Sequence, residues 1–396
     1  MKKFPYLFIL IPSFLLGQEP ETEKGIHFDH SSFTELLAKA KKENKIIMVD
    51  AYTSWCGPCK WMVKNIFPND TVAAYYNTNF INAKIDMEKG EGIELAKKYE
   101  VSCYPTYLFI DGSGQLLHRR SSSMEAKEFI GLGTAALDPA KQFSTYRKKY
   151  EAGNAIPDEM AEYVTMRGRT CLPVKEEMGQ YFKTQKDEDL LSQRNWNILV
   201  ECRMDIRADS REFRYLIDHR ADYEKLYTPG MVAGLIKSCY SFALRNYVTD
   251  KNMDGYNKLK EEITQKKLPF GEEMLLNSDM SLYKSTKDWS SYAEVAAKYI
   301  DKFKKEDYNT LNTIAWDFYE NVSDVAMLAK AEEWAKHSVE LHTGYFNTDT
   351  YAAVLYKLGK KQEAMAAAER AIELAKKENQ DFKDTQQMLD KIKALQ

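Results

Sequence analysis

Two cysteines, Cys56 and Cys59, stand three positions apart where an apolar strand pattern gives way to a helix pattern. Unsatisfied backbone N–H groups at a helix N-terminus stabilise a thiolate, so we expect Cys56 to be the attacking sulfur. Cys59, one turn into the helix, is then placed to resolve a mixed disulfide by attacking the Cys56 sulfur. Gly57 and Pro58 fix the geometry of the turn between them. The spacing therefore predicts thiol-disulfide exchange.

A static disulfide and a zinc site are the alternatives for this cysteine pair. A two-residue spacer closes a loop that is too small to stabilise a fold much. A four-thiolate zinc site needs a second close pair, whereas the other cysteines stand far apart, at positions 103, 171, 202 and 239. No histidine has a ligand-like spacing. We expect neither a metal nor a cofactor.

The elements around the pair form an alternating pattern of strands and helices. Asp50 is a carboxyl group inside the first apolar run, where burial is costly and raises the pKa. The expected strands are Lys45–Tyr52, Phe80–Met87, Pro105–Asp111 and Gln115–Arg119. The expected helices run over 33–40, from the cysteine pair to Phe67, and over 71–76, 91–99 and 124–137. This order predicts an α/β fold, a mixed sheet with helices on both faces.

The dipeptide Asp138-Pro139 marks an expected domain boundary, and the pattern from 141 to 396 is helical. Small residues recur there at a spacing of 33, which suits stacked helical hairpins. Ala331, Ala335 and Ser338 recur as Ala364, Ala368 and Ala371. The segment from 351 to 371 resembles a tetratricopeptide repeat, so we expect such hairpins over about 280–375 in an all-α, helical-repeat domain.

The string Trp55-Cys56-Gly57-Pro58-Cys59-Lys60 resembles the active-site motif of the thioredoxin superfamily. Within this superfamily, the segments Ile66–Asp70 and Asp111–Gly114 resemble those of its periplasmic, disulfide-reductase type. The resemblance covers residues 25–138 and implies a thioredoxin-like domain there. It implies that Asp50 relays the proton of the resolving cysteine and that Lys84 pairs with this carboxylate. A satisfied polar group is the alternative for Asp50, and a solvated strand residue is the alternative for Lys84.

The segment from Val101 to Thr106 resembles the cis-proline loop of the same superfamily. A cis bond before Pro105 would present the Tyr104 backbone to an extended client segment. The client-binding residues that the resemblance implies are Trp55, Gly57, Pro58, Tyr104 and Pro105. Residues 120–123 depart from the pattern, because they lack the glycine usual near the substrate groove, and Lys64 replaces a kinking proline.

The remaining cysteines have less specific signals. We favour Cys103 as an unreactive small residue, with a surface disulfide as the alternative. Buried free thiols are the default for Cys171, Cys202 and Cys239, and one structural disulfide among them is the alternative.

Residues 1–17 predict a secretory signal peptide, since Lys2 and Lys3 precede an apolar run and polar residues follow. An uncleaved anchor is the alternative. The composition, 44% hydrophobic and 29% charged with a net charge of −3, is that of a globular protein without a footprint for nucleic acid. After cleavage of the signal we expect no membrane span and a periplasmic protein.

These observations predict an exported thiol-disulfide oxidoreductase that reduces disulfides of client proteins. Its expected partners are those clients and an upstream thiol electron donor. A disulfide isomerase is the alternative enzyme. A helical-repeat scaffold with an accessory thioredoxin-like domain is the alternative from another class.

Overall fold

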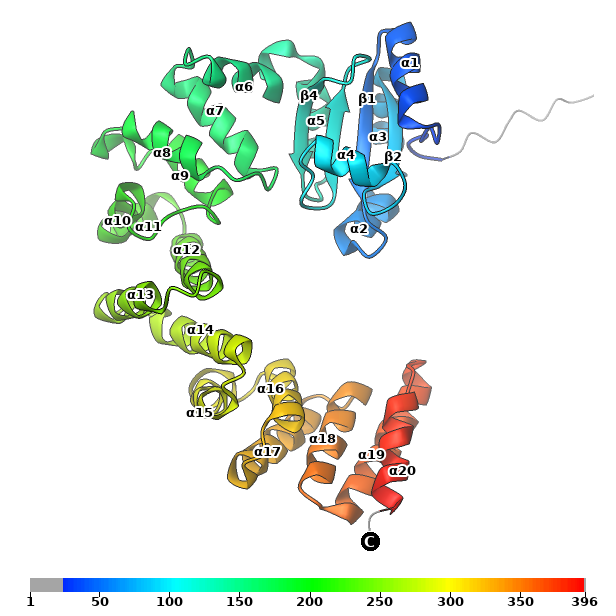
Figure 1. Cartoon of the computed structure of the whole chain (residues 1–396), viewed down its shortest axis with the longest axis vertical. Helices are drawn as coiled ribbons and strands as arrows, with labels where there is room; N and C mark the ends of the chain where they lie inside the picture. The colour runs from blue at the N-terminus through cyan, green and yellow to red at the C-terminus, as the bar shows by residue number, and fades with distance from the viewer. Residues whose placement is uncertain (1–23, 395–396) are drawn as a thin grey trace, which may run out of the picture. The chain divides into compact units, whose positions relative to one another are not determined.

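The computed structural model describes residues 24–394 (Figure 1). The chain forms two compact units, of which the first ends at Asp205 and the second begins at Ile206. They are named unit 1 and unit 2, and each is described by itself. The expected signal peptide, residues 1–17, lies outside the described residues.

Unit 1 begins with a four-stranded mixed sheet of strand order β2-β1-β3-β4. β1 pairs in parallel with β2 and antiparallel with β3, and β3 pairs antiparallel with β4. The strands are β1 (Ile46–Tyr52), β2 (Phe80–Asp86), β3 (Thr106–Ile110) and β4 (Leu116–Ser121). The mixed sheet predicted from the sequence is confirmed.

Helices cover both faces of this sheet, because alternate strand residues point to opposite sides. On β1, Ile47, Val49 and Ala51 pack in one buried cluster with α1 and α4. Met48 packs on the other face with α2, α3 and α5. The helices are α1 (Phe33–Glu43), α2 (Gly57–Asn65), α3 (Asp70–Asn79), α4 (Gly92–Lys98) and α5 (Ala126–Leu137). Asp50 shares the parity of Met48, so its side chain faces the layer that contains α2.

Four more helices of unit 1 follow the sheet, and α6 packs on β4. The N–H of Phe143, the first residue of α6, donates to Nδ1 of buried His118 on β4 at 3.1 Å. Burial, together with the charge of nearby Arg120, lowers the pKa of His118 to about 4, so the neutral ring can accept this bond. The compact unit therefore continues past the boundary expected near Asp138. The helices are α6 (Phe143–Glu151), α7 (Pro157–Gly168), α8 (Lys175–Lys183) and α9 (Gln193–Glu201), with short 3-10 turns at Pro139–Lys141 and Asp187–Asp189.

The described residues of unit 2 are helices joined by short turns. Its first helices are α10 (Arg211–Asp218), α11 (Arg220–Leu226), α12 (Pro229–Thr249), α13 (Met253–Gln265), α14 (Gly271–Thr286) and α15 (Trp289–Tyr299), which continues into a π-helical turn, Ile300–Lys304. Its last helices are α16 (Tyr308–Asn321), α17 (Val325–Leu341), α18 (Tyr345–Lys357), α19 (Lys361–Glu378) and α20 (Lys383–Ala394). The predicted all-helical region is confirmed.

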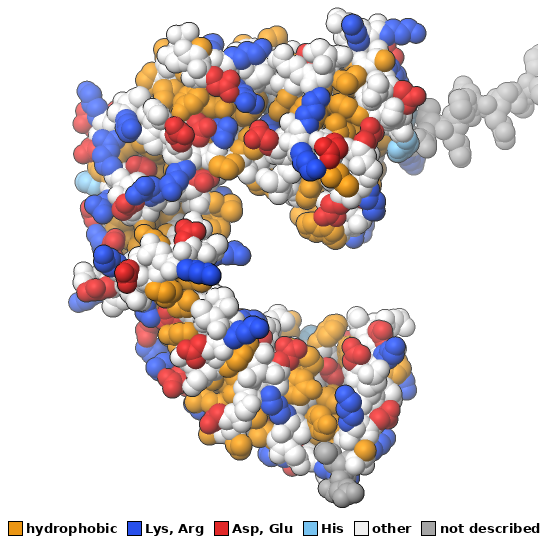
Figure 2. All heavy atoms as spheres, in the orientation of Figure 1, with side chains coloured by type: hydrophobic (Ala, Val, Ile, Leu, Met, Phe, Trp, Pro, Cys, Tyr) orange, Lys and Arg blue, Asp and Glu red, His pale blue; other side chains and the backbone are white. Residues whose placement is uncertain are grey.

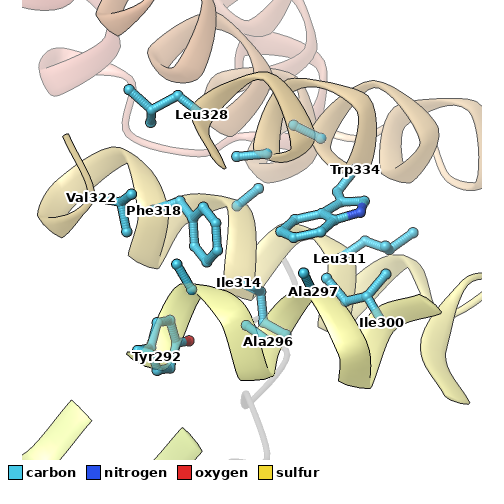
Figure 3. Packing of buried hydrophobic residues seen from close by; sticks show 14 of the residues in the cluster. Tyr292, Ala296, Ala297, Ile300, Leu311, Ile314, Phe318, Val322, Leu328 and Trp334 are labelled. Carbon is cyan, nitrogen blue, oxygen red and sulfur yellow. The ribbon is translucent and has the colours of Figure 1, made fainter. Parts of the chain in front are cut away.

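The core of unit 2 lies between neighbouring helices. Figure 3 shows Phe318 of α16 between Tyr292 of α15 and Trp334 of α17, in one buried cluster. The small residues of the 33-residue repeat are buried in α17 and α19, the second helices of consecutive hairpins. The spacing thus corresponds to the same packing position in two hairpins, and their tetratricopeptide type stays a prediction.

Figure 2 shows basic and acidic side chains interspersed on the surface of each unit. Within residues 24–394, none of the helices combines the length and the apolar character that crossing a bilayer requires.

Candidate functional site

Cys56 and Cys59 lie at the N-terminal end of α2. Cys56 is the N-cap of this helix and forms a disulfide with Cys59, with the two Cα atoms 5.3 Å apart. The backbone N–H of Cys59 donates to the Cys56 sulfur at 3.0 Å. Pro58 stands in the first helical turn, where its missing N–H leaves no bond unmade. The predicted pair is therefore in place at a helix N-terminus, where a thiolate on Cys56 would be stabilised.

Both cysteine side chains are buried in this state, at 2% and 3% exposure, whereas their neighbours Gly57 and Pro58 are exposed. The Trp55 side chain is 65% exposed. Its indole N–H donates to Glu88 at 3.0 Å, which fixes the ring beside the cysteine pair. The exposed rim around a shielded disulfide leaves Trp55, Gly57 and Pro58 available to a large partner.

Asp50 and Lys84 are brought together by the register of β1 and β2. The two residues are partners in the parallel pairing. Lys84 Nζ lies 3.6 Å from Asp50 Oδ2, which is an ion pair too long for a hydrogen bond. The ammonium also lies over the Tyr52 ring, 4.7 Å from its centroid. The pairing that the resemblance implied is thus present as a loose contact.

The Asp50 carboxyl is 1% exposed, and neither of its oxygens has a hydrogen-bond partner among the described residues. Burial raises its pKa to about 6, although Lys84 acts in the opposite direction. The Tyr107 and Thr53 hydroxyls are also buried, and within residues 24–394 they have no hydrogen-bond partner. Tyr107 is opposite Asp50 in the pairing of β1 with β3. A carboxyl group that can change its charge near neutral pH is suited to giving and taking a proton.

The loop before β3 lies beside the cysteine pair. The peptide bond between Tyr104 and Pro105 is cis, as predicted. The Tyr104 ring meets the Trp55 ring edge to face, with centroids 6.1 Å apart. The structure therefore places the predicted client-binding residues of the two loops next to each other. Their roles stay predictions.

The interpretation of Cys103 and Cys171 as thiols was wrong. Cys103 forms a disulfide with Cys171, in the turn between α7 and α8, with Cα atoms 6.2 Å apart. Cys171 is exposed rather than buried. The two residues are 68 positions apart, so the contact depends on the packing of α6 and α7 beside β4. The one signal that could have found it was the position of Cys103, two residues before Pro105.

Cys202 is a buried free thiol, as expected, and burial raises its pKa. Cys239 is also buried, in α12. Between residues 24 and 394, no group of three or more His, Cys, Asp or Glu side chains is arranged to hold a metal ion.

Comparisons with known proteins agree with this geometry. A family model described as thioredoxin-like matches residues 30–112. Over 108 residues the chain is 38% identical to thioredoxin H4 of Arabidopsis thaliana, covering 26% of this chain and 87% of that protein. Over 94 residues it is 33% identical to the thiol:disulfide interchange protein DsbD of Yersinia pestis, covering 23% of this chain and 16% of that one.

A solved structure from Bacteroides thetaiotaomicron, provisionally assigned as a disulphide isomerase, is 45% identical to this chain. The match covers 29% of this chain and 95% of that one, with a TM-score of 0.28. Against several curated thioredoxins of rice and fruit flies, the chain spans only about three fifths of their length, 59% to 64%. The residues matched by the family model include both cysteines of the CXXC pair of thiol-disulfide oxidoreductases, Cys56 and Cys59.

Proposed function

This chain belongs to the thioredoxin family, and from that premise we propose that it is an exported oxidoreductase that reduces disulfides of client proteins. The observation that carries the proposal is the Cys56–Cys59 disulfide at the N-terminus of α2, the helix that covers the sheet face on which the Asp50 carboxyl is buried.

The reaction needs a reduced pair at the start. The Cys56 thiolate attacks one sulfur of a client disulfide, forms a mixed disulfide and releases the other client sulfur as a thiolate, which takes up a proton. Cys59 loses its proton to Asp50 and attacks the Cys56 sulfur. This step forms the Cys56–Cys59 disulfide and releases the second client sulfur as a thiolate, which takes up a proton. Two electrons thus pass to the client, and an upstream thiol donor must return two electrons to the pair.

Reduction is favoured over isomerisation because the Gly57-Pro58 spacer resembles that of reducing thioredoxins. Direction depends on the reduction potential of the pair and on the donors available. An isomerase would rearrange a scrambled protein without net oxidation of Cys56 and Cys59. Measuring the redox state of this pair after one round with scrambled ribonuclease would separate the two activities.

Insulin reduction by dithiothreitol tests the oxidoreductase proposal. We expect the wild-type chain to accelerate precipitation of the insulin B chain and Cys56→Ser to show the rate of the uncatalysed reaction. Cys202→Ser is a matched control, since this buried thiol lies in the same unit but outside the CXXC pair. Equal rates for wild type and Cys56→Ser would contradict the proposal.

A recruiting role for unit 2 is the second part of the proposal. A cavity of about 320 Å³ and another of about 550 Å³ lie along its helices, and both are lined by Asn277 and Ser281 of α14. Exposed amide and hydroxyl groups on a stack of helices suit the binding of an extended polypeptide backbone. A scaffold without redox activity would use the same surface, and the insulin assay distinguishes the two.

Export is proposed from the sequence of residues 1–17 alone. Mass spectrometry of the native protein should find an N-terminus near Gln18. An intact Met1 on protein from a cytosolic fraction would contradict both the signal and the periplasmic location.

A further inference from the structure

The turn between α7 and α8, residues 169–173, is fastened to the loop that precedes β3. The Cys103–Cys171 disulfide joins the two segments. The Ser102 hydroxyl donates to the Cys171 carbonyl oxygen at 3.2 Å. The N–H of Ser121, at the end of β4, donates to the Arg169 carbonyl oxygen at 3.1 Å. The 169–173 turn therefore contacts two separate segments of the sheet domain.

These two segments border the cysteine pair. Cys103 is followed directly by Tyr104, whose ring packs on Trp55, the residue before Cys56. After β4, the N–H of Ser122 donates to the carbonyl oxygen of Pro105 at 3.0 Å. Residues 103–105 and 121–122 thus form one continuous rim beside the site, and the 169–173 turn lies along that rim.

The contact also covers the edge of the sheet. β4 is an edge strand, and an edge strand offers unpaired N–H and C=O groups to any extended chain. At the end of this edge, the N–H of Ser121 already donates to the Arg169 carbonyl oxygen and is not available to another chain. An extended polypeptide that pairs beside Tyr104 is therefore blocked from continuing across the end of β4.

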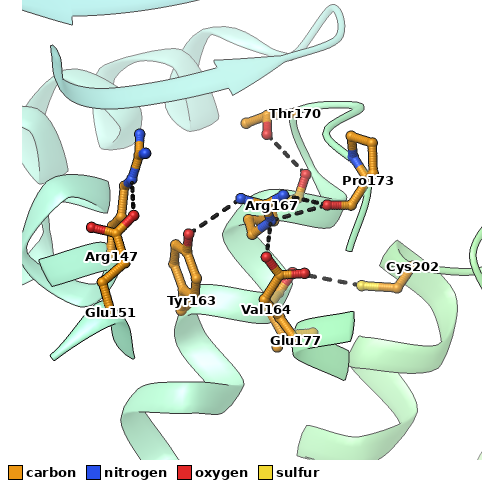
Figure 4. A network of polar contacts seen from close by, with 9 residues as sticks. All are labelled: Arg147, Glu151, Tyr163, Val164, Arg167, Thr170, Pro173, Glu177 and Cys202. Atoms are coloured by element: carbon orange, nitrogen blue, oxygen red, sulfur yellow. Dashed lines mark hydrogen bonds and ion pairs between the residues drawn. The ribbon is translucent and has the colours of Figure 1, made fainter. Parts of the chain in front are cut away.

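The turn has its own rigid support within the helical layer. Figure 4 shows the Arg167 guanidinium directed at the Pro173 carbonyl oxygen, the Tyr163 hydroxyl and the Glu177 carboxylate. The Thr170 hydroxyl donates to the Arg167 carbonyl at 2.8 Å. The turn is therefore preformed, and the disulfide fixes its position against the rim rather than its shape.

We propose that the 169–173 turn is a specificity-determining wall of the client site, held in place by the Cys103–Cys171 disulfide. The inference rests on the proposed function, because it concerns the clients of the Cys56–Cys59 pair. A small disulfide reaches Cys56 past this wall without hindrance. A folded protein must instead present its disulfide on a segment narrow enough to fit between Trp55 and the wall.

Site-specific photocrosslinking in the full chain tests the position of the wall. A benzoylphenylalanine replaces Pro173, which is exposed, in a chain that carries Cys59→Ser. The mixed disulfide with insulin is then formed on Cys56 and irradiated. Peptide mapping first verifies that the Cys103–Cys171 bond is intact. The control places the same crosslinker at exposed Asn154, beyond the other end of α7 and about 18 Å away along that helix.

We expect crosslinking of insulin from position 173 and none from position 154. A mixed disulfide that forms but does not crosslink from 173 would overturn the wall and leave the oxidoreductase proposal intact. Absence of any mixed disulfide on Cys56 would overturn the proposed function instead.

Kinetics test whether the disulfide holds the wall. The double variant Cys103→Ser/Cys171→Ser is compared with wild type on insulin and on the small substrate hydroxyethyl disulfide, and its fold is checked by circular dichroism. We expect the double variant to reduce hydroxyethyl disulfide at the wild-type rate. Its kcat/KM for insulin should differ from the wild-type value by at least about threefold. An unchanged ratio in a folded, active variant would overturn the role of the bond.

Discussion

The buried carboxylates of units 1 and 2 differ in their hydrogen-bond partners. In unit 2, buried Asp317 accepts hydrogen bonds from the Tyr292 hydroxyl at 2.6 Å and from Lys284 at 2.7 Å. In unit 1, Asp50 is more deeply buried, and its oxygens have no hydrogen-bond partner among the described residues. The nearest cation to Asp50, Lys84, stays at 3.6 Å.

The arrangement around Asp317 recurs within unit 2. Asp279 of α14 accepts from the Tyr256 hydroxyl at 2.8 Å and from Lys260 at 2.5 Å, both on α13. A buried carboxylate with both a tyrosine and a lysine partner has its desolvation cost offset, and it links neighbouring helices. The contrast teaches that Asp279 and Asp317 hold helices together, whereas Asp50 lacks such partners in the described part of the chain, as the proposed proton transfer requires.

The largest expected difference between the units concerns their thiols. Cys56→Ser removes the sulfur that we propose attacks the client, so we expect client reduction to fall by at least roughly a thousandfold. Cys239→Ser, in α12 of unit 2, should leave the rate within about twofold of wild type, because this thiol is buried in packing and touches no reacting atom. Steady-state insulin reduction measures both. A large loss of insulin reduction in Cys239→Ser would contradict the view that the redox reaction depends on the thiols of unit 1 alone.

The second prediction concerns stability. The Cys103–Cys171 bond closes a loop of 68 positions within unit 1. Chain-entropy arguments give such a cross-link about 4 kcal/mol. We therefore expect Cys103→Ser/Cys171→Ser to lower the free energy of unfolding of unit 1 by about this amount and to leave unit 2 unchanged. Hydrogen exchange measured on individual peptides reports the stability of each unit separately. Equal losses of protection in both units would show that they unfold together.

The third prediction is that two Asp-to-Asn substitutions change the free energy of unfolding in opposite directions. The pKa of Asp50 is raised from 3.8 to about 6, so the folded state binds a proton more tightly than the unfolded state. The charged carboxylate therefore lowers the free energy of unfolding. This loss is absent below about pH 4 and reaches its full size above about pH 6. Asp50→Asn should stabilise the protein by up to about 3 kcal/mol at pH 8 and by nothing at pH 3.5. The same variant should slow the resolution of the mixed disulfide.

Asp317→Asn is the matched variant in unit 2. It weakens satisfied bonds from Tyr292 and Lys284, so we expect a loss of about 1–3 kcal/mol. Urea unfolding at pH 8 and pH 3.5 measures both variants. Destabilisation by Asp50→Asn at pH 8 would mean that Asp50 is a structural residue like Asp317.

Local sequence signals were enough to predict the strands, the helices between them and the cysteine pair. The strand predicted at 45–52 is β1 (Ile46–Tyr52), because a short, near-continuous apolar run is typical of a strand that is buried on both faces. The Asp50 and Lys84 contact follows from parallel register once both strands are placed. The 33-residue recurrence of small residues corresponds to buried positions of α17 and α19.

The contacts that depend on packing could not be predicted in this way. Cys171 reaches Cys103 only because α6 packs on β4, and the bond between Phe143 and His118 that fixes α6 has no local signal. The extent of unit 1 to Asp205 has the same cause. Ser122 adopts a φ of 91°, a conformation that usually requires glycine. The hydrogen bond from its N–H to the Pro105 carbonyl oxygen holds it there, and no glycine in the sequence indicates this conformation.

The smallest expected effect tests what unit 2 adds to a reaction carried out in unit 1. A chain that ends at Asp205 keeps the CXXC pair, Asp50 and the Cys103–Cys171 bond. We expect it to reduce hydroxyethyl disulfide within about twofold of the full-length rate, because a small substrate gains nothing from a second binding surface. Client proteins trapped by Cys59→Ser should fall by about tenfold, because a tethered client is held near the site at a high effective concentration.

A point variant separates the binding surface of unit 2 from its bulk. Asn277 and Ser281 line both cavities of this unit and are exposed, so Asn277→Arg can block the surface without disturbing the core. If the cavities hold clients, the full-length Asn277→Arg protein should lose trapped clients as the shortened chain does, and keep its rate on the small disulfide. Quantitative mass spectrometry of the mixed disulfides compares the three proteins. Equal capture by all of them would confine client recognition to unit 1, where the wall beside Cys103 would then have to supply it.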